Sequence, residues 1–529
     1  MKKIILAILT FTSLAVSAQT IRSPGGNLAL IFTINSAGIP SYRLSYGDRF
    51  IVKESALGIE LSEQTSFVRN FTIIKIDSSL VDESWNTVWG EVKSIRNNYR
   101  ELSVTLGQTD AVNRIIVLRF RLFDDGLGFR YEFPQQENLN YFTVKDELTQ
   151  FNLAADHIAF WIPGDYDSNE YYYTKTRLSG IDAAIGRNMN EISVKSLIDK
   201  NYIQSPLMLK SDDGIYINIF EAAQINYPAM HLKVDQSEFI LTSQLVPDAA
   251  GNKAYLQTPC STPWRTIIVS KNAADILSSK LILNLNEPSK IEDVSWIKPM
   301  KYVGIWWEMH VNKSSWNYAD LNNVNLSSTN WNALKPNGRH GATTENTKRY
   351  IDFASKHGFD GVLVEGWNVG WEDWFGKWKE NVFDFVTPYP DFNIAELSEY
   401  AAEKNVNLIM HHETSASVTN YERRMDEAYA LMKKFGYPAV KTGYVGKIIP
   451  RGEHHDGQWM TDHYIRTAEK LAENRMMLNA HEPVRPTGLS RTYPNWLACE
   501  AARGNEFNAW SVGNPPEHET ILPFTRLMG

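Results

Sequence analysis

The second half of the chain alternates short apolar runs with longer segments of helical periodicity, and this alternation constrains the fold most. The apolar runs are Tyr302–Trp307, Gly361–Val364, Asn407–Met410 and Met476–Leu478. Near-continuous apolar strands that alternate with helices are typical of parallel sheets with both faces covered. At this length we expect a (β/α)8 barrel of the TIM type, with a doubly wound open sheet as the alternative.

The segments between these runs carry start and stop signals of helices. Thr343 or Thr344 can cap the first helix, and Gly358 can end it. A second helix stops at Gly436 and has one apolar face, formed by Tyr421, Met425, Ala428, Met432 and Phe435. We expect a third helix from about His463 to Asn474.

The first half has a different pattern, in which short β-rich runs are separated by turn residues. Leu28–Ile34, Arg114–Phe123 and Gly128–Phe133 are such runs, and Asp124–Gly126 forms a turn between two of them. We predict a large antiparallel β-sandwich here. A linker near Asn284–Pro299 separates the two patterns, so the chain is expected to be a multidomain protein of α and β structure.

The first residues predict export from the cytoplasm. Met1–Lys3 is basic, Ile4–Ala15 is apolar, and Val16–Ala18 offers a cleavage site before Gln19. We therefore expect a signal peptide at residues 1–18, a sandwich domain at 19–290, a barrel at 291–529, and a periplasmic location in a Gram-negative bacterium. No later segment reaches about 18 uninterrupted apolar residues, so no membrane span is expected.

The last residues, Ile521–Gly529, have the texture of a further strand, roughly the seventh of the barrel. On that interpretation the barrel is incomplete near its last strands. We therefore expect the 529-residue chain to be a fragment of a longer protein.

The composition narrows the class of ligand. A net charge of -8 argues against nucleic acid as a partner. The chain has 16 Trp, 24 Tyr and 23 Phe residues, whose flat faces suit sugar rings, although large cores also use them. Cys260 and Cys499 are expected to be free thiols rather than a disulfide. The sequence leaves the oligomeric state open.

Several predicted parallel strands end in ionisable residues, and in a barrel such strand ends converge on one mouth. The residues at the predicted strand ends are Trp307, Glu308, Glu365, His411–Glu413, Lys441, His481 and Glu482. Two carboxylates from separate strands, Glu413 and Glu482, then face each other, as glycoside hydrolysis requires. Glu500 and Glu506 follow nearby, and such carboxylates can grip a hard cation or act as acid and base. Ordinary polar strand ends are the alternative.

Longer motifs carry a resemblance to a known family. These are Gly164–Asp167, Glu365–Asn368, His411–Ser417, Pro450–His455, Asn479–Glu482 and Arg485–Gly488. The chain resembles glycoside hydrolase family 97, and most closely its calcium-dependent, inverting α-glucosidases. This resemblance implies an N-terminal β-super-sandwich, a (β/α)8 barrel and a small C-terminal β domain, the last of which is absent from this sequence.

The resemblance also implies a role for each site residue. Glu506 matches the general acid, and Glu413 and Glu482 match the carboxylates that activate water. The implied ligands of a calcium ion (Ca²⁺) are Glu170, Glu482, Glu500 and Glu506, with water or substrate completing the shell. The implied substrate-binding residues are His411, His481 and Lys441. The expected activity is exo-acting release of glucose from maltodextrins and other α-glucan oligosaccharides.

One position separates the branches of the family. Retaining, α-galactosidase-like members place an Asp nucleophile at the end of the fourth barrel strand, whereas Val440–Tyr444 contains no carboxylate. This predicts inversion, with Glu506 about 6.5–9.5 Å from Glu413 and Glu482. The alternatives are a retaining or inverting α-galactosidase-type enzyme of the family and a non-catalytic sugar-binding surface protein.

Other conspicuous residues have simpler interpretations. His454 and His455 are expected to make loop contacts rather than bind a metal, and Asp384 and Asp391 to form turns. Five tryptophans near the predicted strand ends are candidates for stacking on sugar, of which we expect only one or two to do so: Trp306, Trp307, Trp367, Trp371 and Trp374.

Overall fold

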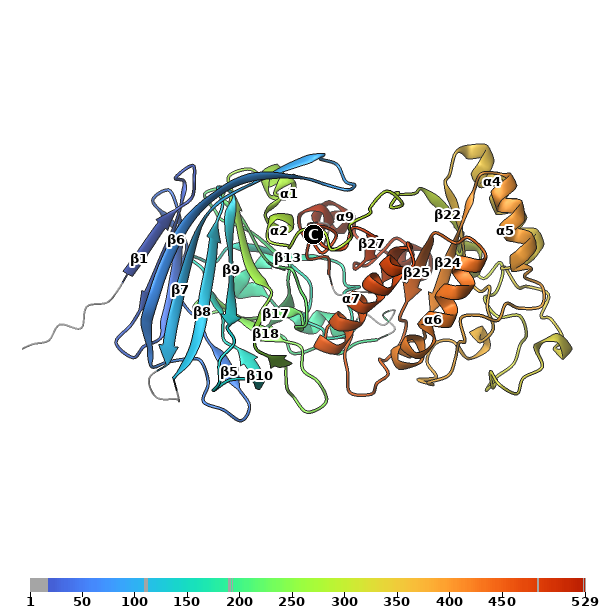
Figure 1. The fold of residues 1–529 in the computed structure, drawn as a ribbon, viewed down its shortest axis with the longest axis horizontal. Helices are drawn as coiled ribbons and strands as arrows, with labels where there is room; N and C mark the ends of the chain where they lie inside the picture. The colour runs from blue at the N-terminus through green and yellow to red at the C-terminus, as the bar shows by residue number, and fades with distance from the viewer. Residues whose placement is uncertain are drawn as a thin grey trace, which may run out of the picture.

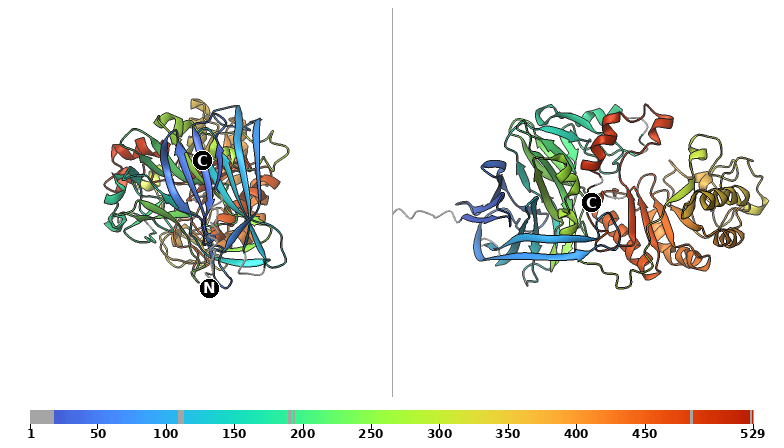
Figure 2. Two further views of the ribbon diagram at one scale, coloured as in Figure 1. Left: turned by 90° about the vertical axis from the view of Figure 1, so that its left-hand side faces the viewer. Right: turned by 90° about the horizontal axis from the view of Figure 1, so that it is seen from above.

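The computed structural model describes residues 18–108, 113–188, 192, 194–482, 485–526 and 528. It shows a β-rich unit and an α/β unit lying end to end (Figures 1 and 2). The predicted signal peptide lies outside the described residues except for Ala18, which begins the first strand. Among the described residues, no helix has the length and apolar character needed to cross a membrane.

The strands of the β-rich unit are antiparallel and form sheets of four, three, four and ten strands among the described residues. The first sheet contains β1 (Ala18–Arg22), β2 (Leu28–Ile34), β3 (Pro40–Tyr46) and β4 (Arg49–Ala56). The second contains β19 (Ala254–Gln257), β10 (Tyr141–Glu147) and β5 (Ile59–Leu61). The third contains β11 (Gln150–Asn152), β18 (Ile240–Leu245), β17 (Met230–Asp235) and β14 (Tyr202–Gln204).

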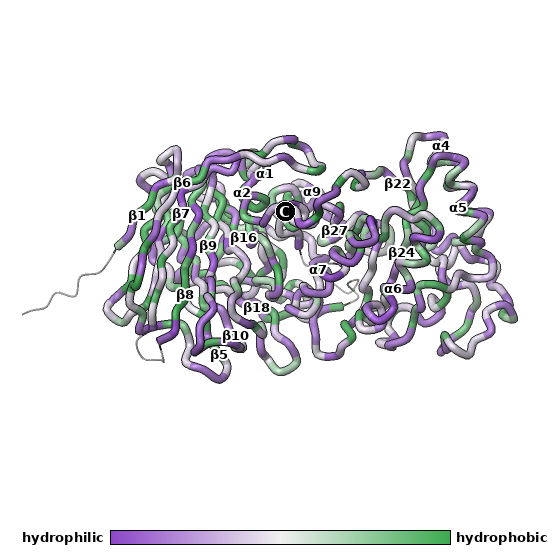
Figure 3. Tube along the Cα trace, in the orientation of Figure 1, coloured by the Kyte–Doolittle hydropathy of each residue, from purple (hydrophilic) through white to green (hydrophobic). Residues whose placement is uncertain are grey.

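The ten-stranded sheet has the order β13 (Thr174–Arg177), β12 (Ile158–Trp161), β15 (Leu207–Lys210), β16 (Tyr216–Ala222), β21 (Trp264–Ser270), β9 (Gly126–Phe133), β8 (Arg114–Leu122), β7 (Ser94–Gln108) and β6 (Phe71–Asn86), with β20 (Cys260–Ser261) paired to β9. Buried and half-buried residues alternate along β8, as a sheet with one face on the core requires. Figure 3 shows that hydrophobic and hydrophilic residues also alternate along the strands of this sheet.

The sheets pack on one another around a shared core. Phe32 on β2 contacts Phe120 on β8, with ring centroids 5.8 Å apart, and both rings are fully buried. The predicted antiparallel, β-rich N-terminal domain is therefore confirmed. Short helices follow its last strand: α1 (Ala273–Ser278) and α2 (Leu281–Asn284). Turns of 3-10 helix lie at η1 (Leu178–Gly180) and η2 (Ala183–Asn188).

The α/β unit contains six parallel strands that follow one another in chain order across the sheet. They are β22 (Tyr302–Ile305), β23 (Gly361–Val364), β24 (Asn407–Glu413), β25 (Ala439–Gly443), β26 (Met477–His481) and β27 (Trp496–Glu500). A doubly wound sheet would reverse its strand order at a switch point, so this alternative is wrong. The order is that of a partial barrel.

Helices cover the outside of this sheet, as Figure 1 shows. They are α4 (Thr344–His357), α5 (Ile394–Glu403), α6 (Val418–Lys434) and α7 (Gln458–Glu473). Shorter helical segments elsewhere in this half of the chain are α3 (Trp307–His310), α8 (Phe507–Trp510), α9 (Pro516–Ile521), η3 (Trp331–Ala333), η4 (Trp371–Asp373) and η5 (Leu522–Phe524). The predicted ends of α4 are confirmed, because Thr343 accepts a bond from the Asn346 N–H and Gly358 has φ +70°. Helix α7 begins five residues before the predicted His463.

Two sequence predictions about this unit are wrong, and one strand was not foreseen. The first strand ends at Ile305, and Trp307 begins α3 instead of extending the strand. Strand β27 was not predicted. The described residues from Ile521 onward do not form the predicted strand, because Pro516 and Pro523 lie in the helical segments α9 and η5. Ile521 packs with Tyr171 and Tyr173 of the β-rich unit.

The hairpin of β6 and β7 is much longer than its neighbours and reaches the α/β unit (Figures 1 and 2). Near its tip, the Trp89 indole donates to the Pro494 carbonyl over 2.7 Å. Trp85 donates to Asn284 over 2.8 Å and lies under the guanidinium of Arg491. The hairpin therefore joins the two units over a large separation in sequence. Cys260 and Cys499 are both free, as predicted.

A buried ionic cluster lies in the core of the β-rich unit. Arg265 on β21 donates to Glu147 over 2.7 and 2.8 Å and to Glu221 over 2.6 Å, and all three side chains are fully buried. Removing one member of such a cluster leaves an uncompensated charge in a medium of low dielectric constant.

We expect Arg265→Met to lower the free energy of unfolding by about 3–5 kcal/mol, because Glu147 and Glu221 lose their common cation. Urea unfolding followed by tryptophan fluorescence measures this loss. The control is Arg43→Met in the exposed pair with Glu54, which should cost less than about 1 kcal/mol. Equal effects of the two substitutions would contradict the account of the buried cluster.

Candidate active site

A cavity of ≈ 600 Å³ opens at the carboxyl ends of the parallel strands. All eight residues predicted for the site line it: Glu170, His411, Glu413, Lys441, His481, Glu482, Glu500 and Glu506. Seven come from the α/β unit, and Glu170 comes from the loop between β12 and β13 of the β-rich unit. The structure therefore brings together residues separated by more than 300 positions in the sequence.

Strand register sets the relative heights of the charged groups. His411 on β24 is paired with Lys441 on β25, and His481 on β26 is paired with Glu500 on β27. Because the strands are parallel and in register, these side chains emerge at one end of the sheet. The unpredicted strand β27 is what carries Glu500 to this edge.

Glu413 lies at the last position of β24 and is 4% exposed. One of its oxygens, Oε1, accepts bonds from the Ser415 N–H (2.7 Å) and the Val445 N–H (3.2 Å). Burial and the neighbouring Glu482 nevertheless raise the pKa of Glu413 to about 8. Gly443 stands opposite on β25, where a Cβ would lie 2.1 Å from Oε2, so the close approach requires glycine.

Glu482 follows β26 and has φ +51°, a conformation that is unfavourable for a residue with a side chain. Neighbouring groups hold it in place. The Tyr444 N–H donates to Glu482 Oε2 over 3.0 Å, and the Tyr464 hydroxyl donates to the Glu482 carbonyl over 2.9 Å. Backbone strain of this kind collects at functional sites, where the surrounding structure fixes one conformation.

Glu365 follows β23 and forms a polar cluster on one wall of the cavity. Its carboxylate lies 3.3 Å from Lys441 Nζ and 3.5 Å from His411 Nε2, and accepts a 3.0 Å bond from the Trp316 indole. Burial lowers the pKa of His411 to about 4, so Lys441 supplies the positive charge near neutral pH. The sequence placed Glu365 at a strand end but assigned it no role.

His481 and Glu500 form a second polar cluster. His481 Nε2 lies 2.8 Å from Glu500 Oε2, and Lys441 Nζ lies 3.8 Å from the same oxygen. Burial alone would lower the pKa of His481, but Glu500 outweighs it and raises this pKa to about 9. Conversely, burial would raise the pKa of Glu500, but His481 and Lys441 lower it to about 2. The pair is therefore ionised at neutral pH.

Glu170 and Glu506 have no such compensation by a bonded cation. Burial and repulsion by Glu482, Glu506 and Glu500 raise the pKa of Glu170 to about 8. Burial and Glu500 also raise the pKa of Glu506 above its usual range. A carboxyl that retains its proton near neutral pH can act as a general acid.

A calcium ion, which the family resemblance implies, takes six to eight oxygen ligands. Among the residues that the structure describes, no three His, Cys, Asp or Glu side chains stand close enough together to hold a metal ion. Glu170, Glu482 and Glu500 do line one small cavity of ≈ 20 Å³, roughly the room of a single ion or water. The donor chemistry of these mutually repelling carboxylates therefore fits a hard cation, although they do not stand at bonding distance.

Aromatic rings form another wall of the cavity. Trp371 stacks on His411 with centroids 5.8 Å apart and lies 5.0 Å from Trp374. Trp306, Trp371 and Trp374 line the cavity, whereas Trp367 is buried and donates to the His411 carbonyl, and Trp307 does not line it. Trp316 and Phe375 also line the cavity; they were not predicted to do so, because only the folded loops bring them there.

Two histidines and two aspartates, for which the sequence predicted loop contacts and turns, do not line this cavity. His454 and His455 each bond Asp167 through Nδ1, over 2.8 and 3.0 Å, as loop contacts rather than metal ligands. Asp384 accepts from two N–H groups that follow it and forms a turn, as predicted. Asp391 also lies in a turn, as predicted, which the Phe392 N–H closes by donating to the Tyr389 carbonyl over 3.0 Å, and its side chain pairs with His340 over 2.9 Å.

Paired carboxylates in an aromatic-walled cavity at the ends of parallel strands define a glycoside hydrolase. The chain belongs to glycoside hydrolase family 97. The family model described as Glycosyl-hydrolase 97 N-terminal matches residues 21–288, and that described as Glycoside hydrolase 97 matches residues 306–502.

Known relatives agree with this assignment. The solved structure of a family 97 enzyme from Pseudoalteromonas sp. strain K8 in complex with acarbose has a TM-score of 0.86 and 39% identity, over 97% of this chain and 73% of that one. A variant of that enzyme in complex with panose matches equally well, with a TM-score of 0.86, 39% identity and the same coverage. A retaining α-galactosidase from Bacteroides thetaiotaomicron is 26% identical, over 99% of this chain and 74% of the relative.

We expect Glu500→Gln to lower the pKa of His481 from about 9, because burial and Lys441 are then opposed by Glu482 alone. Histidine-selective NMR titration in a chelating buffer measures the change. The His463 signal is the internal control, because this imidazole bonds Glu422 and does not line the cavity. A His481 pKa that stays near 9 would show that Glu500 is not its main partner.

Proposed function

We propose that the protein is an exo-acting, inverting α-glucosidase that releases glucose from maltodextrins and other α-glucan oligosaccharides. The observation that carries this proposal is the placement of carboxylates on the parallel strands. The third strand, β24, ends in Glu413, whereas the fourth, β25, presents Lys441 and Gly443 and no carboxylate. A nucleophile at the end of the fourth strand, which the retaining branch uses, is therefore missing.

Two comparisons support glucose as the released sugar. Acarbose and panose, the ligands of the Pseudoalteromonas structures, are oligosaccharides with α-linked glucose units. The chain shares 39% identity with that enzyme and 26% with the Bacteroides α-galactosidase. Sugar specificity depends on the residues that line the pocket rather than on the fold.

In the proposed mechanism Glu506 donates a proton to the glycosidic oxygen, which suits its raised pKa. Glu482 and the ionised form of Glu413 hold a water molecule on the opposite face of the sugar and remove its proton as it attacks the anomeric carbon. Inversion requires room for this water, so a separation of about 6.5–9.5 Å between Glu506 and the two bases stays a prediction. His411, His481 and Lys441 bind the sugar hydroxyls.

Glu170, Glu482, Glu500 and Glu506 are the proposed ligands of a calcium ion. When bound, the ion would supply positive charge that stabilises developing negative charge and aids sugar binding. Glu170, as a ligand from the β-rich unit, would tie the two units together at the site. The lining of the small cavity by Glu170, Glu482 and Glu500 supports this ligand set.

The proposal also covers the complete fold of the two units. We infer that the six parallel strands are part of a (β/α)8 barrel in a catalytic domain at residues 291–529, and that the sheets of residues 19–290 form a β-super-sandwich. The unreversed strand order supports the barrel. The basic and apolar start of the chain supports an exported, periplasmic enzyme.

A second candidate is an α-galactosidase of the same family. It is favoured by the curated relatives, a retaining α-galactosidase at 26% identity and a probable one from Streptomyces bingchenggensis at 22%. Turnover of nitrophenyl α-galactoside in preference to the α-glucoside would select this candidate. A lack of turnover on every α-glycoside would instead favour a sugar-binding protein.

We expect proton NMR of maltose hydrolysis to show β-glucose as the first-formed anomer, and a chelator to lower the rate. Glu506→Gln should reduce kcat on maltose by about 10²–10⁴, with a smaller loss on dinitrophenyl α-glucoside, whose leaving group needs little protonation. Glu413→Gln should slow both substrates. Glu396→Gln on the outer helix α5 is the control and should leave activity unchanged. First formation of α-glucose would contradict inversion.

A further inference from the structure

The loop between β12 and β13 delivers Glu170 to the cavity, and a buried carboxylate fixes its shape. Asp165 is fully buried and accepts bonds from the N–H groups of Asp167 (2.8 Å), Ser168 (3.0 Å) and Ser196 (2.9 Å). The Tyr171 hydroxyl donates to its other oxygen over 2.7 Å. The loop is thus a rigid body whose orientation depends on what it docks against.

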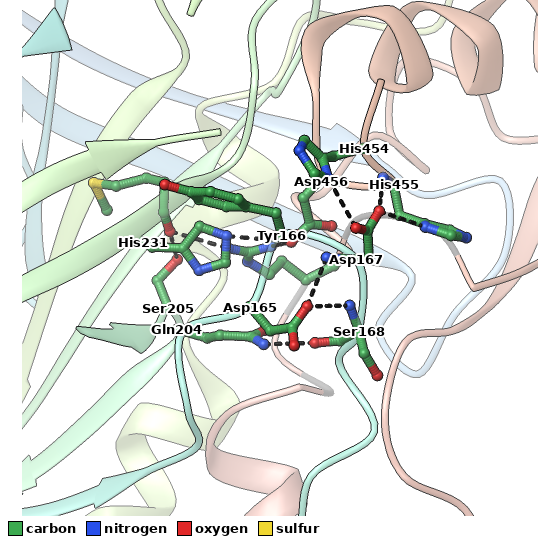
Figure 4. Close-up of polar contacts among 12 residues, drawn as sticks. Asp165, Tyr166, Asp167, Ser168, Gln204, Ser205, His231, His454, His455 and Asp456 are labelled. Carbon is green, nitrogen blue, oxygen red and sulfur yellow. Dashed lines mark hydrogen bonds and ion pairs between the residues drawn. The ribbon is translucent and has the colours of Figure 1, made fainter. Parts of the chain in front are cut away.

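Asp167 makes the docking contact across the interface between the two units, as Figure 4 shows. Its two oxygens bond His454 Nδ1 over 2.8 Å and His455 Nδ1 over 3.0 Å, and the His455 N–H donates a further 3.0 Å bond. Both histidines lie in the loop between β25 and α7 of the α/β unit. The side chains of Asp167 and His455 are 8% and 4% exposed, so water screens this ion pair poorly.

His455 is also connected to Glu482, which lines the small cavity from the α/β unit. His455 Nε2 lies 3.0 Å from the Tyr444 carbonyl oxygen, and the Tyr444 N–H donates to Glu482 Oε2 over 3.0 Å. Asp167, Glu170, His455 and Glu482 all line the ≈ 20 Å³ cavity. A continuous set of contacts therefore joins Asp167, three residues before Glu170 in the same loop, to Glu482 of the α/β unit.

We propose that Asp167 is a positioning residue that holds Glu170 at the correct place opposite Glu482 by docking its loop onto His454 and His455. This inference rests on the proposed role of Glu170 as a calcium ligand. The two oxygens of Asp167 are bonded to His454 and His455, so its proposed role is to position Glu170 rather than to bind the ion. Its charge matters because a buried carboxylate between two imidazoles fixes geometry more strictly than a neutral amide does.

A purely stabilising ion pair is the rival explanation, and a double-mutant cycle separates the two. If Asp167 acts through Glu170, then Asp167→Asn weakens calcium binding only while Glu170 is a carboxylate. If it only stabilises the interface, the loss is the same in the Glu170→Gln background. Glu422→Gln is the matched control, because Glu422 also bonds an imidazole of the α/β unit, His463, over 2.8 Å without lining the cavity.

The experiment titrates calcium chloride into the full chain and its variants by calorimetry, with hydrogen exchange of residues 165–171 as a second readout. Removing a group that orients a metal ligand costs about 10- to 100-fold in affinity. We expect Asp167→Asn to raise the calcium Kd by that factor and to speed exchange in the loop. We expect no further rise when Asp167→Asn is added to Glu170→Gln, and an unchanged Kd for Glu422→Gln.

An Asp167→Asn variant with the affinity of the unmodified protein, or an equal loss in both backgrounds, would overturn the proposal. Should Asp167→Asn not fold, His454→Gln removes one of the two side-chain bonds and is expected to give a smaller rise in Kd. Absence of calcium binding by the unmodified protein would refute the proposed calcium site itself. That outcome is distinguished from failure of the positioning role, in which the unmodified protein binds calcium normally.

Discussion

Repulsion among buried carboxylates is the constraint on which the rest of this structure depends. Glu170, Glu413, Glu482, Glu500 and Glu506 line one cavity, and in a medium of low dielectric constant like charges at such proximity are costly. Neighbouring cations offset this cost for some of the carboxylates and not for others. Glu500 is compensated by His481 and Lys441 and stays ionised, whereas burial and neighbouring carboxylates raise the pKa of Glu170 and Glu413. The carboxyl groups of one cavity therefore differ in their ionisation near neutral pH.

The charged groups that line the cavity come from separate strands and loops of both units. Parallel strands place Lys441 beside His411 and Glu500 beside His481, and a strained backbone turns Glu482 toward Tyr444. The β-rich unit contributes Glu170 through a loop that Asp165 shapes and Asp167 docks (Figure 4). The candidate active site of this family 97 chain is thus lined by residues of both units, and contacts between the units lie beside it.

The sequence predicted the features that local signals determine. Thr343 and Gly358 mark the ends of α4, and the strand-end positions of Glu413 and Lys441 placed them in one cavity. It did not predict β27, whose register depends on pairing with β26, nor the β6–β7 hairpin contact with Pro494. The strand predicted at Ile521 is wrong because tertiary packing against Tyr171 overrides the local apolar pattern. Docking of Asp167 onto His454 joins positions 287 residues apart, which no local rule relates.

The central claim is that carboxylates from both units surround one cation. The most direct test is a crystal structure grown in calcium chloride, with anomalous scattering used to locate the ion. The account predicts a single calcium ion bonded by Glu170 of the β-rich unit together with Glu482, Glu500 and Glu506 of the α/β unit. An ion bonded without Glu170, or a cavity that stays free of calcium at millimolar concentration, would contradict it.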